Sequence, residues 1–410
     1  MALEPTGRLR ETFRALRNPG FRSFWMASFV SNVGMYAQDI AQGWVVLEMT
    51  GSAEWLGLAA GARTLPSLLL SPLGGVYADR WNRRLTLGVY QAVMAMSAAV
   101  LAVLVYLDAA EPWHFVVAAM VTGAGNALSQ PTNSSLVKDL LPAGDLVSGV
   151  TLYVQQVQIA RTVGPLLASA VFWIASVEYG FHFNALSYIP LLIFCFVGRT
   201  RPDRGAAPVR RGIFRSLLDG AVYARSSRQV WVLLQVAALA SLALFTLPTL
   251  LPVVSREIGS GPHLLAYLNG VAGLAAVVGA TLVPSLLHRY HWVALLRVSL
   301  ALSAAGLFGL VLSRGAAMAF TMSALQSGAG IMVWVIVTAL LQRSVSDEYR
   351  GRVLSLNTLA LGAGMLVGNL GAGVLAERIG LAFAFTALGL VLLAAAIPLI
   401  RPPPDGDEAG

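Results

Sequence analysis

The chain contains 410 residues, of which 57% are hydrophobic and only 12% are charged, and its formal net charge is +8. Soluble globular domains carry about 25% charged residues, so this composition indicates a membrane protein. The positive charge is expected in the loops that flank the membrane, and no basic soluble domain is present that would bind nucleic acid. The single cysteine, Cys195, excludes an intramolecular disulfide.

Long apolar runs recur along the whole chain. A helix needs about 20 residues to cross the hydrocarbon core of a bilayer, and this length predicts an all-α membrane protein with twelve spans. Residues 1–22 lack the short apolar core of a cleavable signal, so we expect them to lead into the first span from the cytoplasm. The spans are expected at residues 22–47, 54–77, 85–107, 113–136, 146–176, 181–198, 230–254, 263–287, 293–312, 316–341, 353–376 and 381–400.

The arginines are distributed unevenly between alternate loops. With both termini in the cytoplasm, the outer loops hold only Arg256, Arg314 and Arg378, whereas the inner loops hold most of the other cations. Positive residues are retained on the cytoplasmic side, so this distribution predicts two cytoplasmic termini. The abundance of Ala, Gly and Arg over Lys suggests a GC-rich prokaryotic genome.

The longest connection, residues 199–229, separates two groups of six spans. It includes an amphipathic segment, Ile213–Ala224, that is expected to lie as a helix on the cytoplasmic membrane surface. The Gly-Ala-Gly of residues 123–125 recurs at residues 328–330, which indicates two parallel repeats. We therefore predict a six-helix bundle at 1–198, a linker at 199–229, a second six-helix bundle at 230–401 and a cytoplasmic tail at 402–410.

A short charged loop separates the second and third spans. Its pattern is Gly75-x-x-x-Asp79-Arg80-x-x-Arg83-Arg84. Gly75 and Asp79 are four residues apart and therefore share one helical face. Asn82 follows at a position where a tight turn favours a left-handed residue, and we expect that conformation for it.

This loop resembles the signature loop of the major facilitator superfamily, which usually has Gly where this chain has Asn82. The resemblance implies a major facilitator fold and a conformational latch that closes the cytoplasmic side. In that latch Asp79 meets the start of span eleven, and Asp139 is the partner of Arg83. Alternatively, the arginines only set the topology. The latch residues are Gly75, Asp79, Arg80, Arg83, Arg84 and Asp139, and the small face offered by span eleven is Gly364, Gly368, Gly371 and Gly373.

Three charged residues, Asp39, Arg63 and Arg161, stand out because they lie well inside predicted spans. A charge at the centre of a span costs about 2.5–3.5 kcal/mol on insertion scales, so such residues are usually functional. At about 1.5 Å per residue, Asp39 and Arg63 lie at similar depths, so they could pair. Asp39 also belongs to a polar stripe with Asn32, Tyr36 and Gly43, whose spacing places them on one helical face.

Other polar residues accompany these charges. In major facilitator transporters spans one, four, seven and ten line a central cavity, so the resemblance implies that these side chains face a path for substrate and protons. The alternative is that the amides and charges form hydrogen bonds between helices of one half. The complete set of proton and substrate residues is Asp39, Arg63, Arg161, Tyr36, Asn32, Asn126, Gln130, Gln155, Gln158, Gln326, Trp334 and Asn357.

Gly164 and Pro165 in span five resemble the Gly-Pro signature of export-type members, which kinks that span and lets it pack against the opposite half. Further similarity lies at Arg17–Arg22, at Leu47–Ser52 and at Arg350–Val353. The chain thus resembles the bacterial branch that contains the enterobactin exporter and the macrolide and multidrug efflux proteins. An arginine typical of the span-four signature is replaced by Ala119, which leaves its proton relay in doubt.

The resemblance implies a secondary active exporter of amphiphilic small molecules, drug-like or siderophore-like, that is coupled to protons and works by alternating access. We expect a monomer in the lipid bilayer. No enzyme activity, cofactor or metal is expected, since the sequence has no Walker Gly-Lys-Ser/Thr loop, no Gly-x-Ser-x-Gly elbow and no metal-spaced histidines. The alternatives are an importer or facilitator of a small metabolite on the same fold, or a membrane sensor that transports nothing, which the short loops disfavour.

Overall fold

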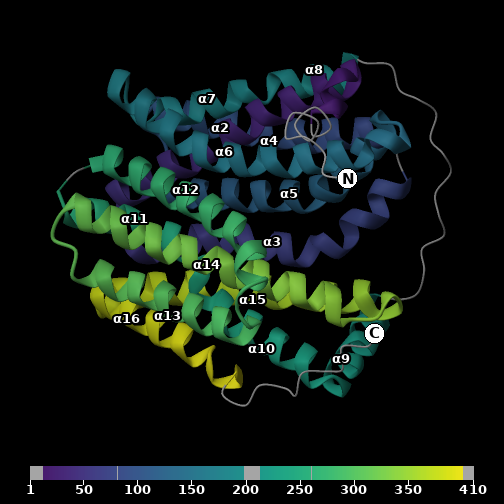
Figure 1. Cartoon of the computed structure of the whole chain (residues 1–410). Coiled ribbons are helices and arrows are strands. Elements are labelled where there is room, and N and C mark those ends of the chain that lie inside the picture. Colours follow the sequence, from purple (N-terminus) through teal and green to yellow (C-terminus); the bar gives the residue numbers. More distant parts are fainter. Residues whose placement is uncertain (1–12, 81, 198–212, 260, 400–410) are drawn as a thin grey trace. The chain divides into compact units, whose positions relative to one another are not determined.

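The computed structural model describes residues 13–80, 82–197, 213–259 and 261–399, without the side chains of residues 72–80 and 213–217. Within these ranges every regular element is a helix (Figure 1), as predicted. Three short 3-10 helices lie at Arg14–Arg17, Ala143–Asp145 and Ile397–Leu399. The long helices are α2 (Pro19–Thr50), α3 (Ala53–Arg80), α4 (Arg83–Tyr106), α5 (Pro112–Leu140), α6 (Leu146–Ile174), α12 (Gly261–Leu287), α13 (Trp292–Val311), α14 (Ala316–Ser344) and α15 (Asp347–Arg378).

The remaining predicted spans are built from shorter helices. Span six consists of α7 (Tyr179–Ser187) and α8 (Ile189–Val197), and span seven of α10 (Arg228–Leu244) and α11 (Leu247–Glu257). Pro190 and Pro248 stand at the second positions of α8 and α11, because proline fits the first turn of a helix and cannot continue the preceding one. Span twelve contains α16 (Leu381–Ala394). Every predicted span therefore coincides with a helix or a pair of helices.

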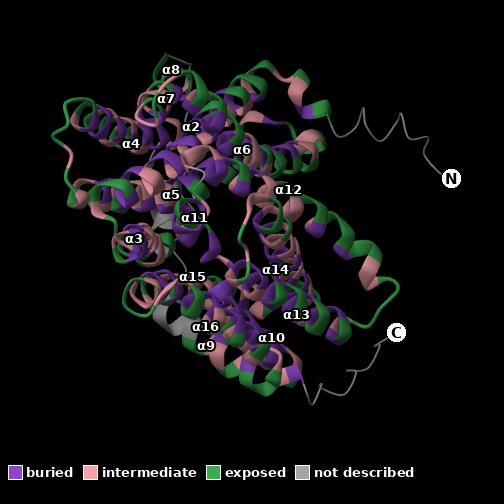
Figure 2. Ribbon diagram, turned by 90° about the vertical axis from the view of Figure 1, so that its left-hand side faces the viewer, coloured by how far each residue is buried: buried purple, intermediate pink, exposed green. Residues whose placement is uncertain are grey.

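Among the described residues, nine helices or helix pairs are long and apolar enough to cross a membrane. The other three predicted spans, α2, α3 and α5, carry the polar residues Asn32, Asp39, Arg63 and Asn126. Helix α4 carries exposed residues (Figure 2). Those on one side form an apolar stripe that supports a bilayer environment, because such a surface would be unfavourable in water. The stripe repeats every three or four residues and comprises Leu85, Val89, Val93, Met96, Val100 and Val103.

Residue contacts divide the chain into two compact units. The first comprises Met1–Met49 and Leu65–Val209, and the second comprises Thr50–Thr64 and Arg210–Gly410. In the first unit α4 packs against α5, α7 and α8, and in the second α13 packs against α14 and α16. Span three thus contacts spans four and six, just as span nine contacts spans ten and twelve, which is the pattern of a parallel repeat.

Helix α2 packs closely against α7 and α6 in the first unit. Buried Gln38 accepts a hydrogen bond from Asn184 Nδ2 of α7 at 2.7 Å. Gly34 lies one turn earlier against Ser187, where an added Cβ would stand only 2.0 Å from the Ser187 Oγ atom. On the side of α6, Trp25 Nε1 donates to the Leu152 carbonyl at 2.9 Å. Glycine and a buried amide pair therefore bring α2 close to α7 and fix their register.

Helix α9 (Ile213–Ser226) is the amphipathic segment expected in the linker. One side of it packs on the start of α15, where the rings of Tyr223 and Tyr349 stack with centroids 4.5 Å apart. Asp219 also lies 3.6 Å from Arg352. Leu218 and Val222 remain exposed one turn apart. This apolar edge is suited to a membrane surface, and its location there stays a prediction.

Candidate functional site: the charged loop and the polar face of α2

The charged loop begins with a helix cap. Asn82 has φ −57° and ψ 106°, and its side chain accepts hydrogen bonds from the backbone N–H groups of Arg84 and Leu85 at 3.1 and 3.3 Å. The expected left-handed conformation of Asn82 is therefore wrong. Asparagine is among the best residues at the N-cap of a helix, and here its Oδ1 atom accepts from two N–H groups in the first turn of α4.

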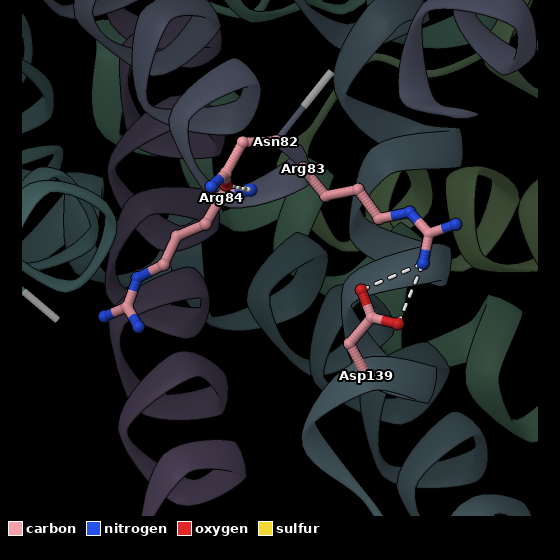
Figure 3. A network of polar contacts seen from close by, with 4 residues as sticks. All are labelled: Asn82, Arg83, Arg84 and Asp139. Carbon is pink, nitrogen blue, oxygen red and sulfur yellow. Dashed lines mark hydrogen bonds and ion pairs between the residues drawn. The ribbon is translucent and has the colours of Figure 1, made fainter. Parts of the chain in front are cut away.

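The two arginines after this cap diverge (Figure 3). Arg83 Nη1 donates to both carboxylate oxygens of Asp139, at 2.8 and 2.9 Å. This is the partner expected for it, and the ion pair joins the start of α4 to the end of α5. Arg84 points away, donates from Nε to the Phe194 carbonyl of α8 at 2.7 Å, and holds its guanidinium 4.1 Å from the centre of the Phe194 ring.

The inner end of α3 carries the rest of the predicted latch. Gly75, Asp79 and Arg80 lie in the part of α3 whose side chains are outside the described residues. Their contact with span eleven, and the role of the whole latch in transport, stay predictions.

The opposite end of α3 makes close contact with α15 inside the second unit. A Cβ on Gly57 would lie 2.6 Å from the Asn369 carbonyl oxygen and 3.0 Å from the Gly373 Cα atom. At the tip of α3, the Ala53 N–H donates to the Glu377 carboxylate at 2.7 Å. A carboxylate at a helix N-terminus satisfies an unpaired N–H and complements the helix dipole. We call the contact formed by Ala53, Gly57, Asn369, Gly373 and Glu377 the α3–α15 seam.

Of the four glycines on the small face of α15, Gly373 contributes to this seam. Gly364 and Gly368 face α10 instead, where an added Cβ would stand 1.8 Å from Ser241 Oγ and 2.1 Å from the Leu242 carbonyl oxygen. Gly371 has open space beside it. Two of these glycines thus admit α10, and the contact of this small face with the inner end of α3 stays a prediction.

The four residues of the polar stripe of α2 are buried to a similar extent. Asn32, Tyr36, Asp39 and Gly43 are all half-buried, as expected for residues on one face. Helix α5 reaches this region through Asn126, whose Nδ2 lies 3.5 Å from the sulfur of neighbouring Met35. Asp39 belongs to the first unit and Arg63 to the second, so their pairing stays a prediction.

Gly164 of α6 lies against the same helix. A Cβ on Gly164 would stand 2.7 Å from the Tyr36 Cβ atom and 2.9 Å from the Val33 carbonyl oxygen. Pro165 follows within α6, as expected for the Gly-Pro signature. This close approach lies within the first unit, whereas packing of Gly164 and Pro165 against the opposite half stays a prediction.

The polar side chains of α5 and α6 differ in how far they are buried. Gln130, Gln155 and Arg161 are exposed, and Gln158 is half-buried. Gln156 is instead fully buried, and neither polar atom of its side chain has a hydrogen-bond partner among the described residues. The sequence analysis missed this residue, although it continues the buried series of Gly149, Ala160, Gly164 and Ala168 at helical spacing.

In the second unit the predicted residues also divide into two groups. Gln326 is 1% exposed, and its amide donates to the Leu244 carbonyl of α10 at 3.4 Å, so it contributes to helix packing. Asn357 is buried, and its Oδ1 atom has no partner among the described residues. Trp334 is 36% exposed and packs edge-on against Phe245, with ring centroids 6.3 Å apart. Trp334 and Phe245 thus present a partly open aromatic surface.

Comparisons with known proteins identify the family. A family model for transmembrane secretion effectors, MFS_3, matches residues 10–408. The chain belongs to this family. It is a transporter of the major facilitator superfamily, in the efflux branch, and is not an enzyme. No group of three metal-binding side chains occurs in the described part of this transporter.

The relatives of the transporter cover most of its length. It is 23% identical to the staphyloferrin A transporter of Staphylococcus aureus over 350 residues, which are 84% of this chain and 86% of that protein. It is 22% identical to macrolide efflux protein A of Streptococcus pyogenes over 366 residues, or 85% and 87% of the two chains. A bacterial homologue of the human lysosomal transporter Spinster shares the fold, with a TM-score of 0.75, 15% identity and coverage of 93% and 96%.

Proposed function

We propose that this transporter exports amphiphilic small molecules, drug-like or siderophore-like, across the bacterial inner membrane in exchange for protons, by alternating access. The observation that carries the proposal is the half-buried polar face of α2, with Asp39 in the middle of a span. A carboxylate inside a membrane is costly and is usually retained for function. The names of the relatives, a siderophore transporter and a macrolide efflux protein, support the substrate class.

The two units offer groups that suit an amphiphile. In the first unit, Asn32, Tyr36 and Asp39 supply hydrogen-bonding and charged groups along one face of α2. In the second, Phe245 and Trp334 supply an aromatic surface. Binding sites for organic molecules combine apolar walls with a few placed polar groups. Asp39 would hold either the exchanged proton or a cationic group of the substrate, since low surrounding polarity strengthens both interactions.

The decisive experiment measures uptake into proteoliposomes and inverted membrane vesicles, with a macrolide, a ferric siderophore and a cationic dye as probes at two pH values. We expect proton-driven accumulation in inverted vesicles, and a loss of at least about tenfold in Asp39→Asn, equivalent to about 1.4 kcal/mol or more.

Asp108→Asn is the matched control, because Asp108 lies in a loop with φ 53°, a conformation that asparagine tolerates equally well. A full transport rate with unchanged pH dependence in Asp39→Asn would remove Asp39 from the mechanism. Accumulation only in right-side-out vesicles would identify an importer instead.

A further inference from the structure

A groove lies on the exposed side of the first unit between α2, α8 and the start of α4. Its volume is about 630 Å³. Its walls are mainly apolar, and several of them are strongly exposed: Met26 is 58% and Val197 is 78% accessible. Val30 and Ile193 continue the same walls. In a membrane transporter, exposed apolar walls of this kind face lipid chains, so lipid is the surrounding medium of this groove.

The groove begins where three helices start or end on one side of the unit. Arg84 is the second residue of α4, and Val197 is the last residue of α8. Val30 lies eleven residues beyond the first residue of α2, Pro19, which corresponds to about 16 Å of helix. Half of the hydrocarbon core of a bilayer is about 15 Å thick, so the groove extends through roughly one leaflet. The arginine distribution predicts that this leaflet is the cytoplasmic one.

Positive charge is concentrated at this end of the groove. The guanidinium of Arg84 lines it and is held in place by the Phe194 carbonyl and ring. Arg22 is exposed on α2, one turn before Met26 on the same face. None of the described residues that line the groove is acidic. A guanidinium binds phosphate through a planar fork of donors, and basic pockets between spans on the cytoplasmic side bind anionic headgroups.

We propose that this groove binds an anionic phospholipid. The headgroup phosphate contacts Arg84, and one acyl chain lies along Met26, Val30 and Ile193. Such a lipid would link the start of α4 to α8 at Arg84, the residue that follows Arg83 in the chain, so the conformation of the charged loop would depend on the lipid composition of the membrane. This inference concerns a site separate from the polar face of α2 and stands whatever the transported substrate is.

The test measures lipid binding without transport. Purified full-length protein is titrated with phosphatidylglycerol or phosphatidylcholine and examined by native mass spectrometry and by thermal shift. We expect one tightly retained phosphatidylglycerol that raises the melting temperature. Retention should be at least about tenfold weaker in Arg84→Gln, because the variant loses the charged hydrogen-bond donor to the phosphate. Arg83→Gln is the matched control, since it removes the same charge from a side chain directed at Asp139.

A second variant keeps the proposal testable if Arg84→Gln does not fold. Ile193→Trp fills the groove and leaves Arg84 and its contact with Phe194 in place, and it should also weaken phosphatidylglycerol retention by about tenfold. Equal losses in Arg83→Gln and Arg84→Gln would attribute binding to general surface charge and overturn the proposal. It would be overturned equally by retention of phosphatidylcholine as strong as that of phosphatidylglycerol, or by unchanged retention in Ile193→Trp.

Discussion

Substitution of Gly57 by leucine perturbs the α3–α15 seam most directly. The added Cβ would meet the Asn369 carbonyl oxygen at 2.6 Å and the Gly373 Cα atom at 3.0 Å, and both are backbone atoms that cannot rotate away. Overpacking of this kind costs about 3 kcal/mol at the upper end of the usual range. Replacing glycine within a helix recovers about 1 kcal/mol of that cost. The net penalty of about 2 kcal/mol corresponds to a shift of roughly 30-fold away from the closed seam.

The assay uses a reporter cysteine at Ala53, which is part of the seam and only 4% exposed. The native Cys195 is the only cysteine of the chain and is replaced by alanine, so labelling reports on one site. A membrane-impermeant maleimide should label Ala53→Cys much faster when Gly57→Leu is present, and transport should slow if the seam opens and closes in each cycle.

Gly371→Leu is the control on the partner helix α15, because a Cβ there meets nothing within 4 Å. If Gly57→Leu and Gly371→Leu label and transport alike, the close approach of α3 and α15 has no part in the conformational equilibrium.

Three further substitutions test single interactions by thermal unfolding. Asn82→Ala removes the Oδ1 atom that accepts both cap hydrogen bonds of α4 and should lower the free energy of unfolding by about 1 kcal/mol, with recovery in Asn82→Ser. Gln38→Leu leaves the buried Asn184 amide without its acceptor and should lower the free energy of unfolding by about 1–3 kcal/mol. The double variant with Asn184→Leu should recover part of this loss, whereas additive losses of the two single variants would contradict the pairing. Glu377→Gln keeps an acceptor for the Ala53 N–H but loses the negative charge at the N-terminus of α3. The free energy of unfolding should fall by about 0.3–1 kcal/mol, and this loss should shrink with added salt. A salt-independent loss would contradict an interaction between the carboxylate and the helix dipole.

The sequence by itself determined the class of protein, the family resemblance and the positions of the spans. Hydropathy is a local property that persists over about 20 residues, so the helices coincide with the predicted runs even where Pro190 and Pro248 break them. The partner of Arg83, Asp139, could also be predicted from the sequence. The signature loop and the end of span four lie on the same side of the membrane in any topology that obeys the arginine distribution.

The tertiary structure decided which neighbour each polar or small residue meets. Arg83 and Arg84 are adjacent in sequence and identical in chemistry, yet one pairs with Asp139 and the other lies on Phe194, because successive residues of a helix point about 100° apart toward different neighbours. Glycines of α15 serve α10 at Gly364 and α3 at Gly373, and nothing in their own pattern separates the two. Composition and spacing specify the faces of a helix, whereas the partner of each face depends on how whole helices pack.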